Sequence, residues 1–465
     1  MGERKMKEKK EKNPKSLKIG SLFAWQSRAV SHGICMMILG YLSIYCTDTL
    51  KMDPYLVGML LVLSKLLDGV TDVFAGYLVD RTNTKIGRGR PYEFCIVGLW
   101  FCTWLMYSCS PSWNLAVKCI WVLSSYALVN SIFFTFLNAN QTVYMVRAFK
   151  YEEQYVALNS YGNIISMVCV AFFNVISPTL VARYAVNASG WSRMIAMIAI
   201  PMVIIGLMRF IFVKETNPVD IQSPDGEKTK VRLKDVKTVL TRNPYIYIVA
   251  LILFIQNFVS NMGVNVYYFT YVAKDLNLMG LVNAAMLLAI PLAAFFPRII
   301  KRFSTGKLIL AGCLITAAGY LLNFFAEGNP ILLGIAGILY GGGITPISIL
   351  FPLMIIDCAD FNEWKGMQRM EGTLGCVTGL ATKIGSALGA GLLGILLSCA
   401  GYIGDMAQIP KSAIWMIRLL FSIIPMLLWL AVGSSFLFYK LDGMLPNIRR
   451  ELEERRAQRE TDIPG

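Results

Sequence analysis

Residues 191–213 have the sequence WSRMIAMIAIPMVIIGLMRFIFV, and residues 214–243 continue as KETNPVDIQSPDGEKTKVRLKDVKTVLTRN. The first stretch is apolar over the roughly 20 residues that a helix needs to cross a bilayer. The second is polar, contains Pro218 and Pro224, and is rich in lysine. The change between them therefore predicts a membrane-spanning helix followed by a linker in water.

Apolar stretches of similar length lie on both sides of this linker. The chain has 465 residues, of which 55% are hydrophobic and 16% charged, a balance more apolar than that of soluble domains. Because a soluble fold could not bury so much apolar surface, we predict an all-α membrane protein with twelve helices in two six-helix bundles, the two-bundle transporter plan. The expected spans are 22–46, 55–80, 92–109, 114–146, 154–182, 191–213, 244–273, 277–298, 307–326, 330–357, 372–402 and 413–440.

The net charge of +15 at pH 7 is distributed in a way that indicates topology. Basic clusters fall on every second connection, and positive loops face the cytoplasm. Both termini are therefore expected in the cytoplasm of a bacterium, with the helices in its inner membrane, and nucleic-acid binding is not expected. The expected segments are a basic tail over 1–19, a bundle over 20–213, a linker over 214–243, a bundle over 244–440 and a charged tail over 441–465.

The composition argues against an enzyme. The chain has one histidine and no zinc, Ser-His or nucleotide motif, and its 11 cysteines lie scattered in apolar spans, where we expect them to be reduced. A membrane sensor would be expected to carry a large soluble output domain, which these segments do not include. The charged N-terminus precedes a span too long for a signal peptide, so no cleaved leader is expected.

Span 55–80 carries three ionisable side chains, which are costly inside a bilayer and are therefore candidates for function. Lys65, Asp68 and Asp72 are spaced so that, at about 100° per residue, they share one helix face. Two carboxylates on one face favour Na⁺, Li⁺ or H⁺, with Lys65 moderating their repulsion. The alternative is a structural Lys65–Asp68 ion pair, although such a pair would not require a second acid one turn away.

Span 372–402 carries Lys383 among Gly385, Gly389, Gly391 and Gly394. The glycines permit close packing of helices. We expect Lys383 to face the transport cavity as a countercharge to the acids of span 55–80. A structural salt bridge to the other half of the molecule is nearly as good an explanation.

Arg28 and His32 lie one turn apart on the same face of span 22–46. We interpret His32 as a solute contact or a participant in proton movement, and a hydrogen-bonded core histidine is the alternative. Arg28 is a solute contact or a side chain that reaches the cytoplasmic interface. Amides and hydroxyls, which suit a hydroxyl-rich solute and also join helices, occur in the fourth and seventh spans at Thr135, Asn138, Thr142, Gln256, Asn257, Asn261 and Asn265.

Three motifs resemble those of a known family. Leu67-Asp68-Gly69-Val70-Thr71-Asp72, with Asp80-Arg81-Thr82 and Gly87-Arg88-Gly89-Arg90-Pro91, resembles the glycoside-pentoside-hexuronide:cation symporters, the melibiose permease group of the major facilitator superfamily. Asp357-Cys358-Ala359-Asp360-Phe361-Asn362-Glu363-Trp364-Lys365, with Arg369 and Glu371-Gly372, resembles the signature after the tenth span, and Tyr267-Tyr268-Phe269-Thr270-Tyr271-Val272 the end of the seventh. The similarity runs from about residue 20 to residue 445.

This resemblance implies positions for the cation and for a cytoplasmic gate. The implied cation ligands are Asp68, Thr71, Asp72 and Thr135, with Lys383 beside them, and Thr71 stands where melibiose permease has an asparagine. The charged loop residues are interpreted as a network that closes the cytoplasmic end. They are Asp80, Arg81, Arg88, Asp357, Asp360, Arg369 and Glu371.

The implied sugar site differs from that of melibiose permease. His32 and Asn138 stand where the permease has galactoside-binding carboxylates, and Thr142 stands where it has a tryptophan. Losing two acids makes the cavity less negative, which favours an anionic solute such as a hexuronide.

We therefore predict cation-coupled symport of a sugar, glycoside or hexuronide by alternating access. The expected partners are a small sugar-like solute, the coupling cation and membrane lipid, with no cofactor besides Na⁺, Li⁺ or H⁺, and the expected form is a monomer. The alternative within transport is a major facilitator carrier of a lipid-like or steroid-like solute.

Overall fold

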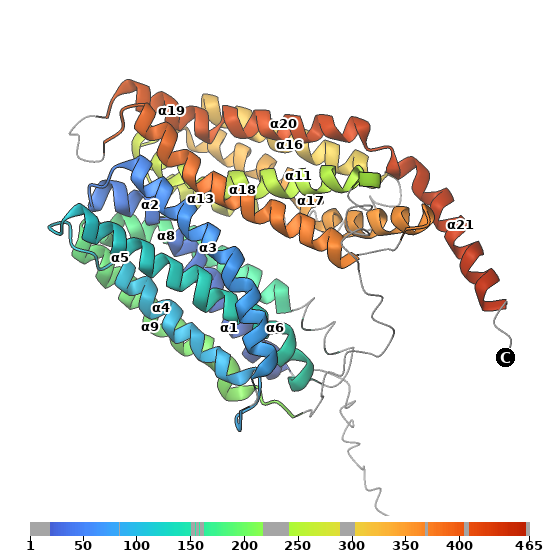
Figure 1. Cartoon of the computed structure of the whole chain (residues 1–465). Helices are drawn as coiled ribbons and strands as arrows, with labels where there is room; N and C mark the ends of the chain where they lie inside the picture. The colour runs from blue at the N-terminus through green and yellow to red at the C-terminus, as the bar shows by residue number, and fades with distance from the viewer. Residues whose placement is uncertain are drawn as a thin grey trace, which may run out of the picture.

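The computed structural model describes residues 19–82, 84–149, 154, 158, 162–216, 241–288, 303–367, 371–403 and 409–461. Within these ranges the chain is helical and contains no β-strand. The helices form two bundles, one from each half of the chain (Figure 1). The prediction of an all-α protein with two helical halves is confirmed.

The first half begins with helix α1, which starts at the predicted end of the basic tail. Its elements are α1 (Ile19–Leu39), α2 (Leu42–Ile44), η1 (Tyr45–Thr49), α3 (Pro54–Arg81), η2 (Arg90–Phe94), α4 (Cys95–Met106), α5 (Leu115–Ala127), η3 (Leu128–Phe134), α6 (Thr135–Ala148), α8 (Asn163–Tyr184) and α9 (Ala188–Phe212). The first, third and fourth predicted spans in this half each consist of more than one element. In the fifth, residues 155–157 and 159–161 lie outside the described residues, and α8 begins at Asn163.

The second half repeats the plan. Its elements are α11 (Tyr245–Asn261), α12 (Val264–Tyr267), η5 (Tyr268–Val272), α13 (Asn277–Leu287), α16 (Thr305–Ala326), α17 (Pro330–Trp364), α18 (Glu371–Cys399), α19 (Lys411–Phe421), α20 (Ile423–Ser435), η6 (Phe436–Phe438) and α21 (Leu441–Thr461). Most of the predicted linker over 214–243 lies outside the described residues. The predicted charged tail forms α21, whose Leu445, Ile448 and Leu452 are buried against the second half.

Short polar residues start several of the spanning helices. Asp53, Asn114, Asn187 and Asn329 each accept a hydrogen bond from a backbone N–H of the first turn of the helix that follows. These side chains satisfy amide groups that have no partner within a helix. The four caps fix where α3, α5, α9 and α17 begin.

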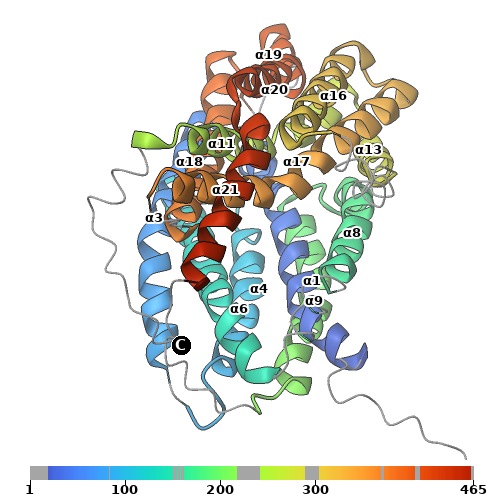
Figure 2. The same ribbon diagram turned by 90° about the vertical axis from the view of Figure 1, so that its right-hand side faces the viewer.

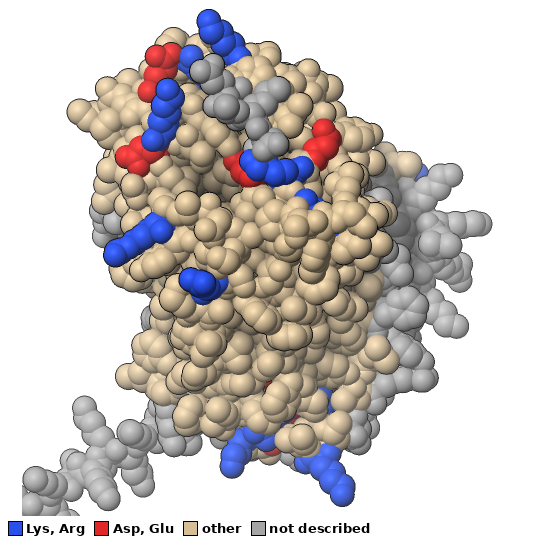
Figure 3. All heavy atoms as spheres, turned by 90° about the vertical axis from the view of Figure 1, so that its left-hand side faces the viewer, with Lys and Arg blue, Asp and Glu red and all other residues tan. Residues whose placement is uncertain are grey.

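The surfaces of the helices suit a lipid environment. Among the described residues, nine helical stretches are long and apolar enough to cross a membrane. Large apolar side chains point outward from them, including Phe172, Ile200 and Phe325. An apolar exterior of this kind is stable only in a bilayer. Figure 3 looks onto the helix ends on the left-hand side of Figure 1, where charged side chains are exposed among the other residues.

The two halves meet at one end of the molecule and separate toward the other. We call the end at α2 and α19 the sealed end, and the end at α6 and α21 the termini end (Figures 1 and 2). One hydrophobic core is shared by both halves and includes Tyr45, Tyr267 and Phe421. The other two clusters each belong to a single half, as Trp25 and Trp429 illustrate.

Glycines allow the close approach of the halves. The halves pack through α3 against α18 and through α8 against α13. A Cβ atom on Gly394 would lie 2.1 Å from the carbonyl oxygen of Pro54, and one on Gly280 would lie 2.6 Å from that of Val175. Gly385 and Gly389 make equally close contacts with α11. The predicted packing role of the α18 glycines is confirmed.

Candidate functional site

A central cavity of about 240 Å³ lies between the two halves. Its lining includes Lys65 of α3 and Asn174 of α8 from the first half, and Asn261, Asn265 and Asn283 from the second. Side-chain amides both donate and accept hydrogen bonds, which matches the hydroxyl groups of a sugar. A solute in this cavity would contact both halves at once.

Two of these amides already connect the halves. The Nδ2 group of Asn283 donates to the backbone oxygen of Asn174 at 3.0 Å and to its Oδ1 at 3.1 Å. On the α18 side, Asn261 Nδ2 donates to Ser386 Oγ at 3.2 Å. The lining of the cavity is therefore held in position by contacts between helices before any solute binds.

A cluster of hydroxyl groups around Asp48 closes the sealed end. The Oδ1 atom of Asp48 accepts hydrogen bonds from Thr47 and Tyr402, both at 2.6 Å, and Oδ2 accepts one from Tyr271. The hydroxyls of Thr47 and Tyr267 lie 2.8 Å apart. Thr47 and Asp48 belong to the first half and the three tyrosines to the second, so this cluster joins the halves.

A second hollow lies beside the Asp48 cluster. This larger hollow of about 590 Å³ is lined by Asp48, Lys51 and Val266, and Val266 also lines the central cavity. The Tyr402 hydroxyl is the donor in its bond to Asp48, because a carboxylate oxygen accepts hydrogen bonds.

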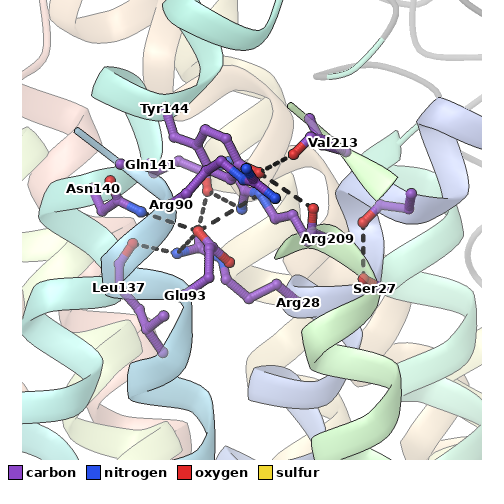
Figure 4. A network of polar contacts seen from close by, with 12 residues as sticks. Ser27, Arg28, Arg90, Glu93, Leu137, Asn140, Gln141, Tyr144, Arg209 and Val213 are labelled. Atoms are coloured by element: carbon purple, nitrogen blue, oxygen red, sulfur yellow. Dashed lines mark hydrogen bonds and ion pairs between the residues drawn. The ribbon is translucent and has the colours of Figure 1, made fainter. Parts of the chain in front are cut away.

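A second polar cluster lies inside the first half (Figure 4). Glu93 is completely buried, and its Oε1 atom lies 3.7 Å from Arg28 Nη1 and 3.8 Å from Arg209 Nε. The same oxygen accepts a hydrogen bond from Asn140 at 3.0 Å, and Gln141 Oε1 accepts from both arginines. One carboxylate thus compensates two buried guanidinium groups.

This cluster contains one of the residues predicted to contact the solute. Arg28 is buried and also donates to the backbone oxygen of Leu137. Among the described residues that line the central cavity, Arg28 is absent. The structure thus gives it a role in packing the first half, and its contact with the solute stays a prediction.

Among the described residues that line the central cavity, His32 and Asn138 are also absent. His32 stacks on Phe134 with ring centroids 4.3 Å apart, and its Nε2 atom is buried without a hydrogen-bond partner in the described chain. Asn138 is exposed, and the side chain of Thr142 lies outside the described residues. Their contact with the solute remains a prediction.

The predicted cation site is on α3 and α6. Asp68 and Asp72 lie on α3, and their side chains are outside the described residues. Thr135 begins α6, is buried, and donates to the backbone oxygen of Asn130 at 3.3 Å. Thr71 is half-buried, Lys65 lines the central cavity, and Lys383 is exposed on α18. The structure does not test cation binding, which stays a prediction.

Two of the predicted gate residues form ion pairs at the termini end. In Arg449 of α21, Nη2 lies 2.7 Å from Asp357 Oδ1 and Nε lies 3.3 Å from Asp360 Oδ2. In the first half, the backbone N–H of Arg88 donates to Glu215 at 3.0 Å. The side chains of Asp80, Arg81, Arg369 and Glu371 lie outside the described residues.

Sequence reasoning missed Asp48, Tyr402, Glu93 and Arg449. Asp48 and Glu93 stand near the ends of their spans, where an acid is usually interpreted as a boundary charge. Tyr271 belongs to the aromatic motif Tyr267–Val272, which offered a signal, because several tyrosine hydroxyls at one helix end need partners. For Arg449 the sequence contained no signal beyond its place in a basic tail.

Comparison with known proteins agrees with this architecture. The family described as "MFS/sugar transport protein" matches residues 27–443. The isoprimeverose transporter of Lactiplantibacillus pentosus is 25% identical over 439 residues, covering 91% of this chain and 88% of that protein. The glucuronide carrier protein homolog of Escherichia coli strain K12 is 23% identical over 444 residues, with 90% and 91% covered.

The fold is similar to that of a solved transporter. The inward open structure of the xylose transporter XylE from E. coli has a TM-score of 0.58 and 13% identity, covering 88% of this chain and 95% of that one. This likeness concerns the fold alone. The predictions of a multi-pass membrane transporter and of a protein that is not an enzyme are confirmed. With the match over residues 27–443 and full-length relatives that are sugar carriers, the chain belongs to the sugar transport family of the major facilitator superfamily, in its glycoside-pentoside-hexuronide:cation symporter group.

Proposed function

We propose that this sugar transporter is a symporter that couples uptake of a sugar, glycoside or hexuronide to entry of Na⁺, Li⁺ or H⁺. The observation that supports this function most directly is the central cavity, which both halves line with amide groups. It is closed at one end by the Asp48 cluster. A cavity with these properties is what alternating access requires, since rocking of the halves would open it to one side at a time.

The proposed orientation places the termini end in the cytoplasm and the sealed end outside. The alternating basic loops support this direction. The structure would then represent the state that is closed to the outside. Entry of a new solute would require the Asp48 cluster to break and the halves to part at α3 and α18.

The proposed cation ligands remain Asp68, Asp72, Thr71 and Thr135. Asp68 and Asp72 share a helix with Lys65, which lines the cavity, so cation and solute would occupy neighbouring positions along α3. Binding of one would then strengthen binding of the other by linkage.

An anionic sugar is the proposed solute class. His32 and Asn138 stand where melibiose permease has galactoside-binding carboxylates, and the described lining of the central cavity contains no acid. A less negative cavity favours a carboxylate or sulfonate on the solute. The glucuronide carrier homolog is a relative whose name fits this class.

The experiment that tests transport is uptake into proteoliposomes. Radiolabelled glucose, xylose, isoprimeverose, glucuronic acid and a steroid are each offered with and without an imposed Na⁺ or H⁺ gradient. Gradient-driven accumulation of a sugar, strongest for glucuronic acid, is the expected result. Uptake of the steroid with no sugar carried would contradict the proposal and favour the amphiphile carrier.

A further inference from the structure

A second cavity of about 210 Å³ adjoins the central cavity inside the second half. The two share the lining residues Asn174, Ser260, Asn265, Met279 and Asn283, so they are neighbouring cavities with a common wall. Each alone is smaller than the roughly 300–1,000 Å³ of a site for a drug-sized ligand, and together they fall in that range. We call the second one the C-terminal compartment.

Aromatic rings and hydroxyl groups line one side of this compartment. Tyr320 of α16 and Tyr340 of α17 meet edge to face, with ring centroids 5.2 Å apart at 80°. Ser260, which also lines the central cavity, adds a hydroxyl to the same lining. Aromatic faces with fixed polar groups suit the apolar C–H faces and hydroxyl edges of a sugar ring.

One polar atom in the compartment is unsatisfied. Asn323 of α16 is 8% exposed and lines the compartment, and its Oδ1 atom has no hydrogen-bond partner among the described residues. A buried acceptor without a donor costs free energy. A ligand that brings an O–H group to Asn323 would remove that cost.

We propose that the C-terminal compartment is a second sugar subsite, in which a second ring lies against Tyr320 and Tyr340 and donates a hydroxyl to Asn323. This inference rests on the proposed sugar-transport function and adds that the preferred solute has two linked rings. One ring would occupy the central cavity, and the asparagines at the junction would surround the linkage. A single sugar ring would leave Asn323 unpaired.

The test compares binding of one-ring and two-ring probes to the purified protein by calorimetry. Glucose and xylose are the one-ring probes, isoprimeverose and cellobiose have two sugar rings, and 4-nitrophenyl β-D-glucoside has a second ring with no hydroxyl donor. The variants are Asn323→Leu, which removes the acceptor, and Tyr340→Leu, which removes a ring. Tyr439→Phe is the matched control, because its buried hydroxyl has no partner in the described chain and lies in the single-half core away from both cavities.

The wild type and Tyr439→Phe are expected to prefer a two-sugar probe over the one-ring probes. Asn323→Leu should weaken the two-sugar probe by roughly threefold to tenfold, the range for one hydrogen bond, and leave the nitrophenyl glucoside unchanged. Tyr340→Leu should weaken binding of both the two-sugar probe and the nitrophenyl glucoside. One-ring binding that survives in each variant shows that the protein is folded.

Two results would overturn the subsite while leaving sugar transport intact. The first is equal binding of one-ring and two-ring sugars by the wild type. The second is a preference for the two-sugar probe that is unchanged in both Asn323→Leu and Tyr340→Leu. If no probe binds the wild type while uptake assays also find no sugar carried, the proposed function itself fails and the subsite fails with it.

Discussion

The hydroxyl of Tyr402 donates a hydrogen bond to Asp48 across 2.6 Å, although 354 residues separate them in the chain. Asp48 ends the first span of one half, and Tyr402 follows the helix α18 of the other. Together with Tyr271, this contact ties the halves at the sealed end. We therefore expect closure of that end to depend on Asp48.

Asp48→Asn is expected to favour the state that is open at the sealed end. Hydrogen bonds to a charged acceptor contribute about 1.5–3 kcal/mol each, so weakening two of them should shift the equilibrium roughly tenfold or more. The measurement is the rate at which a membrane-impermeant maleimide labels Ser43→Cys, a position that lines the central cavity, in a background without native cysteines.

Tyr402→Phe should raise the labelling rate in the same direction with a smaller effect, because Tyr271 still donates to Asp48. Tyr55→Phe, an exposed tyrosine near the start of α3, is the matched control. Equal labelling in all four proteins would mean that the Asp48 cluster does not hold the halves together.

Gly394→Ala is expected to have a similar effect by a steric route. Its Cβ would lie 2.1 Å from the Pro54 carbonyl oxygen and 2.9 Å from Gly58 Cα, so α3 and α18 must move apart. Gly379→Ala on the same helix is the control, because no atom of the described residues lies within 4 Å of a Cβ there. Faster labelling of Ser43→Cys in Gly394→Ala alone would support closure by α3–α18 packing, and no difference between the two variants would contradict it.

Glu93→Gln is expected to destabilise the first half strongly. It removes the carboxylate that lies beside both Arg28 and Arg209, and an uncompensated buried charge costs about 3–5 kcal/mol. The measurement is the apparent melting temperature in detergent. Glu327→Gln is the control, since Glu327 is 66% exposed and pairs with Arg418 at the surface, where such a pair contributes about 0–1 kcal/mol. Equal melting temperatures for the two variants would refute a structural role for the cluster.

The sequence was sufficient to predict the helices because each span had to satisfy its own backbone in lipid. The close packing at Gly389 and Gly394 was also predictable, since runs of small residues in a span have few other uses. The family motifs carried the assignment to sugar transport.

The site was less predictable because its lining depends on contacts between distant residues. Arg28 has the same charge whether it faces a solute or Glu93, and only the packing of α1 against α4 and α9 decides between these roles. Asn174 and Asn283 lie on helices of different halves, and nothing in their local sequence indicates that they meet. The spacing of Asp68 and Asp72 on one helix face needed only helix geometry, which is why that prediction could be made at once.

In the proposed symport, the acids of α3 couple sugar entry to a cation. The most direct test measures accumulation of a carried sugar in proteoliposomes under an imposed Na⁺ or H⁺ gradient, for wild type, Asp68→Asn, Asp72→Asn and the control Asp53→Asn. Asp53 is an exposed acid that caps the same helix, and asparagine can also serve as the cap. Wild type and Asp53→Asn should accumulate the sugar, while Asp68→Asn and Asp72→Asn should lose accumulation and keep downhill exchange. Gradient-driven accumulation at the wild-type level in both α3 variants would contradict the account.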